Sequence, residues 1–447
     1  MRFIPAVSAV RIHLPLPLRP VGQEVKTPPF HGGIASSILA RVTKKVGIRT
    51  QNASGFCFCL KNEMVFFQER SGIGRRISAA RKYMDTIGLY LHIPFCNGKC
   101  PYCDFYSVGD LLLTDQYTDA LLNEMQMQAN DTLMADTFYL GGGTPPLLGT
   151  ENLIRLIQAA RKQFRFSGEA TLEANPNSIT EAMLYRLWEA GFNRISFGMQ
   201  SAVSEELLAL GRRHTPQQVQ EAVKAAQNAG FTNISVDLML GIPHQTLESA
   251  LRSVSFALEL GVQHISAYLL KIEEGTPFCS RGADAQCPAE DVTCDIYLTV
   301  VDVLSRAGFH QYEISNFSLP GLECRHNLKY WHCEEYLGFG PAAHSFWHRR
   351  RWGHTRELRQ YLAAPEQTIF VTDEQAGGFE EYAMLRLRLT EGLDTRTLKQ
   401  FGVSAENLLK KAAQFEKAGY VQIRDGVLSL TPRGFLVSNE LIAGLIL

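Results

Sequence analysis

The sequence contains no apolar run of the roughly 18 uninterrupted residues that a membrane-spanning helix needs. Polar or charged residues interrupt each candidate, including the closing segment 434–447. The sequence also lacks an internal repeat of fixed period and a surplus of one charge, since 44 Lys and Arg residues stand against 45 Asp and Glu residues. These absences argue against a membrane span and a solenoid fold. The length of 447 residues and the 45% hydrophobic content predict a globular protein of two or three domains.

Acidic residues outnumber basic residues beyond the first 82 positions. Residues 1–82 contain 14 Lys and Arg against 3 Asp and Glu, whereas residues 83–447 contain 30 against 42. A nucleic-acid groove needs a basic footprint, so the acidic main part predicts no nucleic-acid partner. Residues 1–83 resemble an organelle transit sequence in composition, but they equally fit a disordered extension or a mis-assigned translation start, because Met84 stands just before the first predicted strand. We assign this segment no function.

Three of the ten cysteines lie close together: Cys96, Cys100 and Cys103 form a C-x3-C-x2-C pattern within eight residues. The pattern differs from the paired C-x2-C spacing of structural zinc sites, and a disulfide would leave the third thiol without a partner. Cubane iron-sulfur clusters normally use four cysteines, so three thiols leave one iron open to a substrate or cofactor. The pattern therefore favours a [4Fe-4S] cluster, with a single zinc ion as the alternative.

Short apolar runs rich in β-branched and aromatic residues alternate with helical segments between residues 86 and 270. Six strands are predicted, at 87–93, 137–140, 170–173, 194–198, 234–240 and 265–270. The helices between them are predicted at 114–130, 151–163, 180–190 and 247–260. This alternation predicts an α/β fold, a partial (βα)6 TIM-like barrel with its functional face at the C-terminal ends of the strands.

Polar residues, cysteines and glycines lie at the C-terminal ends of these predicted strands. The cysteine loop follows the first strand and a glycine-rich segment, 141–145, follows the second. Glu173 ends the third strand, and Gln200 follows the fourth. Any barrel places some polar residues at this rim, but their number here favours a single site built from several loops.

Five separated motifs occur in an order that resembles the radical S-adenosylmethionine enzymes, specifically the HemN/HemW group. The motifs are YLHIPFC at 90–96, GGGTP at 141–145, EANP at 173–176, SFGMQ at 196–200 and VDLMLGIP at 236–243. The resemblance covers about residues 86–447. It implies a [4Fe-4S] cluster on Cys96, Cys100 and Cys103, whose fourth iron chelates the amino and carboxylate groups of S-adenosylmethionine. The residues implied to contact this cofactor are Tyr90, Tyr102, Gly142, Gly143, Thr144, Glu173, Gln200, Arg212, Asp237 and Ala267.

The residue types suit these roles. Glycines allow close approach of a ligand to the backbone, and Glu173 can accept hydrogen bonds from an ammonium group. Gln200 and Asp237 suit ribose hydroxyls, and Arg212 suits a carboxylate. Each residue alone is weak support, because a glutamate at a strand end is commonly a helix cap or a solvated charge. We also expect an external electron donor, because no flavin or second-cluster motif occurs.

The second informative stretch is RHNLKYW at 325–331. A histidine followed by Tyr and Trp offers an axial haem ligand and flat apolar faces, although a histidine in an aromatic cluster is more commonly a hydrogen-bonded core residue. The pattern HNxxYW resembles the signature that separates HemW haem chaperones from HemN coproporphyrinogen oxidases, and Phe105 stands where the oxidases carry a further cysteine. The resemblance thus implies His326 as the haem ligand, with His332 and His344 as weaker candidates.

The leading hypothesis is a haem chaperone that transfers haem to acceptor haemoproteins, membrane proteins possible among them. The alternatives are an oxygen-independent coproporphyrinogen III oxidase and a cluster-bearing scaffold without turnover. We expect a cytoplasmic protein, because an oxygen-sensitive cluster needs a reducing compartment.

The last part of the chain has a different pattern. Helices are predicted at 379–389, 394–400 and 405–418, then a hairpin of 420–423 and 427–430, and a final helix after Thr431. This order predicts a small α+β winged-helix-like domain, whose 9 basic and 10 acidic residues over 371–447 form no DNA-binding face. We therefore divide the chain into residues 1–83, a barrel at 84–320, a connecting segment with the haem motif at 321–374, and a C-terminal domain at 375–447.

Overall fold

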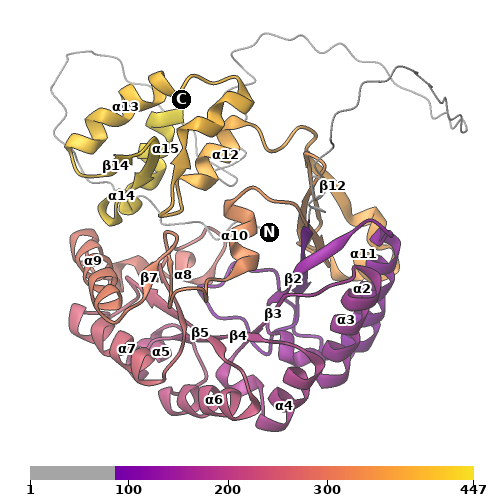
Figure 1. Cartoon of the computed structure of the whole chain (residues 1–447). Helices are drawn as coiled ribbons and strands as arrows, with labels where there is room; N and C mark the ends of the chain where they lie inside the picture. The colour runs from indigo at the N-terminus through magenta and orange to yellow at the C-terminus, as the bar shows by residue number, and fades with distance from the viewer. Residues whose placement is uncertain (1–85, 447) are drawn as a thin grey trace, which may run out of the picture. The chain divides into compact units, whose positions relative to one another are not determined.

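The computed structural model describes residues 86–446 (Figure 1). The predictions for residues 1–83 lie outside the described residues. Six parallel strands form the centre of the fold, and each of them was predicted. They are β1 (Thr86–Ile93), β2 (Met134–Gly142), β3 (Glu169–Ala174), β4 (Arg194–Gln200), β5 (Asn233–Leu240) and β6 (His264–Leu269).

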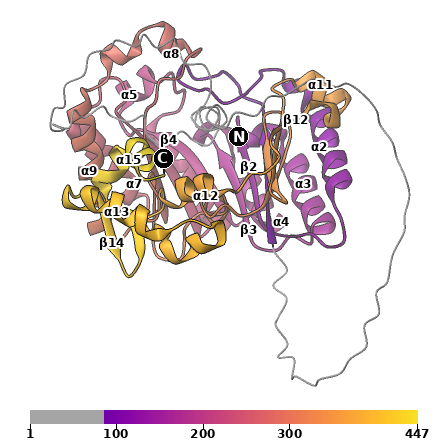
Figure 2. The ribbon, with the colours of Figure 1, turned by 90° about the horizontal axis from the view of Figure 1, so that it is seen from above.

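Helices cover the outer face of these strands, and Figure 2 shows α2 and α3 outside β2 and β3. The helices of this layer are α2 (Thr114–Gln128), α3 (Thr150–Gln163), α4 (Glu181–Ala190), α5 (Ser204–Ala209), α6 (Pro216–Ala229), α7 (Leu247–Glu259) and α9 (Glu290–Arg306). The short helix α8 (Pro277–Ser280) lies beside the cysteine loop instead, where the Phe278 amide donates to the Pro101 carbonyl at 3.0 Å. The sequence analysis missed α5, α6, α8 and α9. The start of α6 carries a clear signal, since Thr215 and Gln218 form a capping box around Pro216.

The two faces of the parallel strands differ in character. Leu89 and Leu91 of β1 and Phe138 of β2 point outward and join the main hydrophobic core beneath the helices. The alternate positions point inward, where Tyr90 and Tyr139 form a separate small cluster. Because successive side chains of a strand alternate between its faces, one apolar face builds the core while the other is left for polar and aromatic groups.

The sheet continues on both sides of the six strands. Its order is β12-β11-β10-β9-β1-β2-β3-β4-β5-β6-β8-β7. The added strands are β7 (His310–Gln311), β8 (Asn316–Ser318), β9 (Tyr336–Phe339), β10 (His344–Trp347), β11 (Arg350–His354) and β12 (Ile369–Asp373). The segment 321–374, predicted as a connecting segment with the haem motif, also contains the strands β9 to β12. Strands of two to five residues are too short to show a period in the sequence.

Helix α10 (Arg325–Trp331) links the two sides of this sheet. It follows β8, which pairs with β6, and it precedes β9, which pairs in parallel with β1. The chain therefore carries the HNxxYW motif across the open side of the barrel. Helix α11 (Leu358–Ala363) lies between β11 and β12.

The C-terminal elements form a second, three-stranded sheet in the order β13-β15-β14. The elements are α12 (Phe379–Arg386), β13 (Leu393–Asp394), α13 (Ala405–Lys417), β14 (Val421–Arg424), β15 (Val427–Leu430), α14 (Pro432–Leu436) and α15 (Ser438–Ile446). The hairpin turn at Asp425 and Gly426 is confirmed, with φ of +51° and +80°. Two expectations were wrong in detail: residues 395–401 form a 3-10 helix, and the single final helix is two helices separated at Val437.

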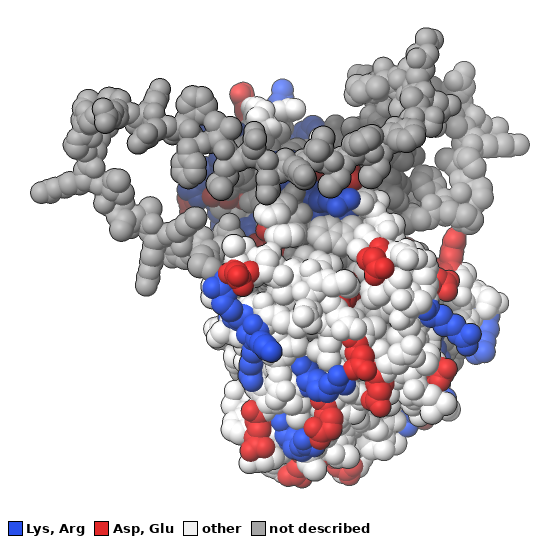
Figure 3. Space-filling model, turned by 90° about the vertical axis from the view of Figure 1, so that its right-hand side faces the viewer, with Lys and Arg blue, Asp and Glu red and all other residues white. Residues whose placement is uncertain are grey.

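The predicted fold class, a partial parallel barrel with a smaller C-terminal α+β domain, is confirmed. The exact limits of the domains stay predictions. No helix among residues 86–446 is long and apolar enough to cross a membrane. On the face of the molecule in Figure 3, basic and acidic side chains of the described residues are interspersed, so this face offers no continuous basic surface for nucleic acid.

Candidate functional site

The cysteine loop leaves the C-terminal end of β1, as predicted. The amide of Cys96 donates to the Val108 carbonyl at 3.0 Å, and the amide of Val108 donates to the Pro94 carbonyl at 2.6 Å. These two bonds hold the loop against its own return segment. Cys96, Cys100 and Cys103 are half-buried, and none of the three is in a disulfide.

The three thiols fit a [4Fe-4S] cluster by their chemistry. Each cysteine of a cubane binds a different iron, so three thiolates would hold three irons and leave the fourth open to a cofactor. Cys96, Cys100 and Cys103 lie on one short loop, partly exposed and outside any disulfide, so each thiol is available to bind a metal.

The glycine-rich segment holds the cysteine loop. The amide of Gly143 donates to the Ile93 carbonyl at 2.8 Å, and the amide of Thr144 donates to the Phe95 carbonyl at 2.7 Å. A Cβ at Gly143 would lie 2.5 Å from the Phe95 carbonyl oxygen. We expected Gly142 and Gly143 to make room for a ligand, but the close approach in this structure is to the protein itself. The Thr144 hydroxyl lies 3.7 Å from the Cys96 sulfur.

Arg212 also contacts the cysteine loop. Its Nη2 donates to Asn175 Oδ1 and to the Gly198 carbonyl, both at 2.7 Å, and its Nη1 lies 3.8 Å from the Cys100 sulfur. Arg213, by contrast, is exposed and donates to the Asn97 carbonyl. Arg212 therefore faces the proposed cofactor site, whereas its neighbour Arg213 lies at the surface.

Glu173 lies inside the barrel below the glycine-rich segment. Its Oε1 accepts from the Tyr139 hydroxyl at 2.6 Å and its Oε2 accepts from the Gly142 amide at 3.1 Å. Burial raises the pKa of Glu173 to about 7; the hydrogen bond from Tyr139 opposes this shift, and the charge of Asp237 adds to it. The carboxyl group is half-buried and near the balance between its two protonation states at neutral pH, so a cation would favour the charged form.

Gln200 and Asp237 stand on the neighbouring strands. Gln200 has a φ of +67°, which is rare for a residue other than glycine, and its Oε1 accepts from the Tyr268 hydroxyl at 2.9 Å. Asp237 accepts from the Ser196 hydroxyl at 3.1 Å, and burial raises its pKa. Both side chains face the barrel interior, where Glu173 lies.

Two of the predicted contacts lie elsewhere. Ala267 pairs with Leu238 on the outer face of the sheet and belongs to the main hydrophobic core. Only its backbone can serve a ligand, because its side chain points away from Asp237. Tyr90 lies deep in the barrel, with its ring centroid 6.3 Å from that of His326. Tyr102 does lie at the rim, where its ring meets Phe278 edge-on.

His326 is 1% exposed on α10 and points into the barrel. Its Nδ1 is hydrogen-bonded to the Thr137 hydroxyl at 2.8 Å, and its Nε2 to the Tyr330 hydroxyl at 2.7 Å. Burial lowers the pKa of His326 to about 3, and the charges of Lys329 and Arg194 lower it further. Since both ring nitrogens are engaged, His326 can bind iron only after one of these bonds is released.

The two weaker candidates lie apart from His326. His332 Nε2 donates to Glu391 Oε1 at 2.6 Å, and the pKa of His332 is raised, because its bonds to Glu334 and Glu391 outweigh its burial. His344 lies on β10, edge-on to the ring of Phe370. The structure therefore does not bring the three histidines together.

The sequence analysis missed Glu169, which positions the haem motif. Glu169 Oε2 accepts from the Arg325 amide at 3.0 Å, and its Oε1 accepts from the His326 amide at 3.1 Å. Arg194, which is also buried, supplies a nearby positive charge. A charged residue at the start of an otherwise apolar strand was the available signal for both.

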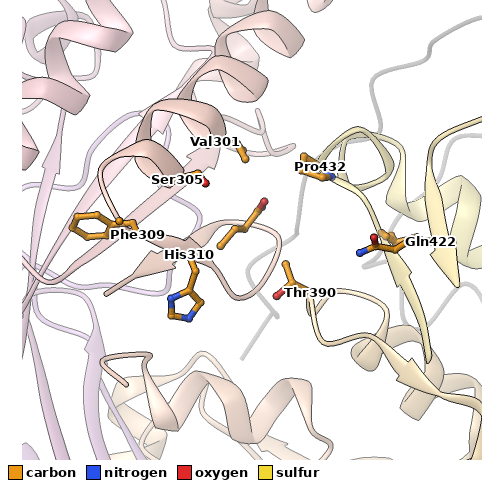
Figure 4. Close-up of a pocket in the computed structure, with 10 residues that line it drawn as sticks. Val301, Ser305, Phe309, His310, Thr390, Gln422 and Pro432 are labelled. Carbon is orange, nitrogen blue, oxygen red and sulfur yellow. The ribbon is translucent and has the colours of Figure 1, made fainter. Parts of the chain in front are cut away.

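A cavity of about 410 Å³ lies away from these residues, between α9 and the C-terminal hairpin. Figure 4 shows Val301, Ser305 and His310 on one side of it and Gln422 and Pro432 on the other. Its lining residues include none of the proposed cluster, cofactor or haem contacts, so the cavity is separate from the proposed cofactor site.

Comparisons with known proteins agree with the sequence motifs. The radical SAM superfamily model matches residues 90–257, and the HemN C-terminal domain model matches residues 379–437. The Heme chaperone HemW of Mycobacterium tuberculosis is 36% identical over 381 residues, which cover 80% of this chain and 94% of that protein. The Heme chaperone HemW of Escherichia coli is 34% identical over 380 residues, covering 80% and 98%.

A solved structure is similar in fold. The coproporphyrinogen III oxidase HemN of Escherichia coli, described as a radical SAM enzyme, aligns with a TM-score of 0.71 over 82% of this chain and 91% of that chain. The identity is 24%, so this likeness bears on the fold alone.

Proposed function

Because the chain belongs to the HemW family within the radical SAM superfamily, we propose that it is a haem chaperone, which binds haem and transfers it to acceptor proteins. The observation that carries the proposal is the identity of 34–36% to proteins of this name over nearly their whole length. The expected family is confirmed by the same comparisons.

Cys96, Cys100 and Cys103 would hold a [4Fe-4S] cluster that supplies an electron to S-adenosylmethionine bound at its open iron. Arg212 orients the loop through its contact with Cys100. Glu173 would accept hydrogen bonds from the ammonium group of the cofactor. Further contacts are proposed for Tyr102, Gly142, Gly143, Thr144, Gln200, Asp237 and the backbone of Ala267.

His326 is the proposed haem ligand, and its use requires a rearrangement. The hydroxyl of Tyr330 occupies Nε2, the ring nitrogen that points along α10 toward Tyr330. Release of this bond frees one nitrogen for iron, while Thr137 can hold the other and fix the orientation of the ring. The neutral state of His326, which burial favours, is the state that binds iron.

Finer aspects of the proposal concern partners and location. We infer an external electron donor, acceptor haemoproteins that include membrane proteins, and a cytoplasmic site of action. The unpaired thiols of the described residues suit a reducing compartment.

An anaerobic assay with coproporphyrinogen III separates this function from the oxidase alternative. The reconstituted protein, incubated with this substrate, S-adenosylmethionine and reductant, should leave the substrate intact. The haem-loaded protein should pass haem to an apo-haemoprotein, followed by the absorbance of the acceptor. Conversion of the substrate to protoporphyrinogen IX would contradict the chaperone function.

A further inference from the structure

Strand β2 presents three consecutive inward positions between the two proposed ligand sites. They are Thr137, Tyr139 and Gly141, which share one face because side chains alternate along a strand. Thr137 is hydrogen-bonded to Nδ1 of His326 at 2.8 Å. The ring of Tyr139 stacks on the His326 ring, with centroids 5.1 Å apart and an interplanar angle of 23°. One end of this face therefore holds the proposed haem ligand.

The other end of the same face holds Glu173. The hydroxyl of Tyr139 donates to Glu173 Oε1 at 2.6 Å. Gly141 leaves the space that the carboxylate fills, since a Cβ there would lie 2.8 Å from Glu173 Oε2. Tyr139 thus contacts the proposed haem ligand with its ring face and the proposed ammonium acceptor with its hydroxyl.

We propose that Tyr139 is a positioning residue that couples the two sites, so that S-adenosylmethionine bound at Glu173 weakens haem binding at His326. The inference rests on the proposed function, because it assumes these two ligand positions. A single side chain joins them, so no larger change of the barrel is needed to carry the coupling.

The direction of the coupling follows from the chemistry of Glu173. A cofactor ammonium holds Glu173 ionised, and an ionised carboxylate accepts a stronger hydrogen bond than a neutral carboxyl group. The stronger bond fixes the Tyr139 ring, and the fixed ring keeps His326 stacked and hydrogen-bonded to Tyr330. Without the ammonium, Glu173 is partly protonated at neutral pH, as its pKa of about 7 indicates, and Tyr139 is held less firmly. The His326 ring is then held less firmly, and its hydrogen bond to the Tyr330 hydroxyl breaks more easily.

The test uses the protein with its cluster reconstituted and titrates it with haem, followed by the Soret band, with and without saturating S-adenosylmethionine. Coupling free energies between two sites typically correspond to about 5–150-fold in affinity, so we expect the cofactor to raise the haem Kd at least about fivefold. Tyr139→Phe keeps the ring and loses the hydroxyl, and the two Kd values should then agree within about twofold, which is below that range.

Tyr297→Phe is the matched control. Tyr297 is a buried tyrosine on α9 whose hydroxyl donates to the Ile314 carbonyl at 2.9 Å, and it contacts neither site. This variant should keep the full effect of S-adenosylmethionine. An equal loss of coupling in both variants would mean that any buried hydroxyl matters, and it would overturn the role of Tyr139.

The failure of the inference differs from the failure of the proposed function. A haem spectrum that is the same in His326→Ala and wild type places haem elsewhere, which overturns the haem ligand assignment and with it the coupling, whereas the chaperone function fails only if haem is not passed to the apo-haemoprotein. Haem bound through His326 with a Kd that S-adenosylmethionine leaves unchanged overturns the coupling alone. The coupling alone is also overturned if S-adenosylmethionine still raises the haem Kd of Tyr139→Phe as much as that of wild type.

A second measurement covers the case in which Tyr139→Phe does not fold. In the wild-type protein with cluster but without haem, S-adenosylmethionine should slow amide hydrogen exchange over residues 325–331, because the fixed Tyr139 ring holds His326 and with it α10. Unchanged exchange over this helix would contradict the proposal.

Discussion

The cysteine loop and helix α10 present their proposed ligand groups in opposite ways. The three thiols of the loop are half-buried at the end of β1 and stand outside any disulfide. The imidazole of His326 is 1% exposed, and the protein's own hydroxyl groups engage both of its nitrogens. The first site is arranged for its ligand in this structure, whereas the second must first break a contact.

This difference bears on the affinity of each site. A ligand that binds only a minor conformation has its affinity reduced by the fraction of molecules in that conformation. We therefore expect a cluster that is held firmly and haem that is bound less tightly than the isolated His326 ligand would allow. Weakened binding suits a protein that must give its haem to an acceptor.

The largest predicted effect concerns the cysteine loop. Cys100→Ser should abolish the absorbance near 400 nm and the bound iron of the reconstituted protein, because a thiolate ligand of the cluster is lost. Haem binding to the variant should change little, since Cys100 does not contact α10. Cys294→Ser, at a buried position of α9, is the control and should retain the cluster. Full retention of iron by Cys100→Ser would show that the loop does not hold a cluster.

Gly143→Ala should disturb the loop without removing a ligand. The new Cβ would lie 2.5 Å from the Phe95 carbonyl oxygen, and overpacking of this kind destabilises by about 1–3 kcal/mol. We expect a lower midpoint of urea unfolding and less bound iron. Gly109→Ala is the control, because nothing lies within 4 Å of a Cβ there. Equal stability of the two variants would mean that the loop adjusts freely.

Tyr330→Phe should make the haem site resemble the cysteine loop, because it leaves Nε2 of His326 available to a ligand. The variant removes the hydroxyl at 2.7 Å from His326 Nε2, and a hydrogen bond of this kind contributes about 1 kcal/mol. Its loss should strengthen haem binding about fivefold, the factor that corresponds to 1 kcal/mol, as measured by titration of the Soret band. Weaker binding in Tyr330→Phe than in wild type would show that Tyr330 supports haem instead of competing with it.

A further predicted effect is a difference in how the free energy of unfolding depends on pH. The folded state binds a proton at Glu173 up to a pKa of about 7, whereas the unfolded state releases it near 4.5, so this group loses its stabilising contribution as pH rises from 4.5 through 7. His326 has a folded pKa of about 3 against 6.5, so its contribution is lost as pH falls from 6.5 towards 3.

Urea unfolding between pH 4.5 and 8 measures both contributions. Glu173→Gln should remove the decline in unfolding free energy at the upper end of this range, and His326→Asn should lessen the decline at the lower end. The same pH dependence in both variants would contradict the assignment of opposite protonation behaviour to the two sites.

Much of the fold could be predicted from the sequence because its central strands are long. The six parallel strands have six to nine residues each, and their apolar outward positions give a clear pattern. Strands β7 to β12 were missed because the pairing of a strand of two to five residues depends on neighbours that are distant in sequence. Strand β9, for example, joins the sheet through β1, nearly 250 residues earlier.

The parts of the candidate site whose motif residues are adjacent in sequence could be predicted. The parts formed by contacts between residues distant in sequence were predicted less well. The placement of the cysteine loop and Glu173 near one rim follows from the order of the strands, whereas Arg212 was predicted only through the resemblance to the family. The contact of Tyr90 with His326 and the hydrogen bonds of Glu169 to α10 join residues more than 150 positions apart. No local pattern in the sequence reports which inward side chains of the barrel meet this helix.

A haem titration of wild-type protein and His326→Ala, followed in the Soret region, tests the central claim most directly. We predict that wild type shifts the Soret band from its position in free haem, and that His326→Ala binds at least about tenfold more weakly, which corresponds to 1.4 kcal/mol. Circular dichroism of the two proteins should agree, since the control requires an intact fold. Identical haem spectra and affinities in wild type and His326→Ala would contradict the assignment of haem to α10.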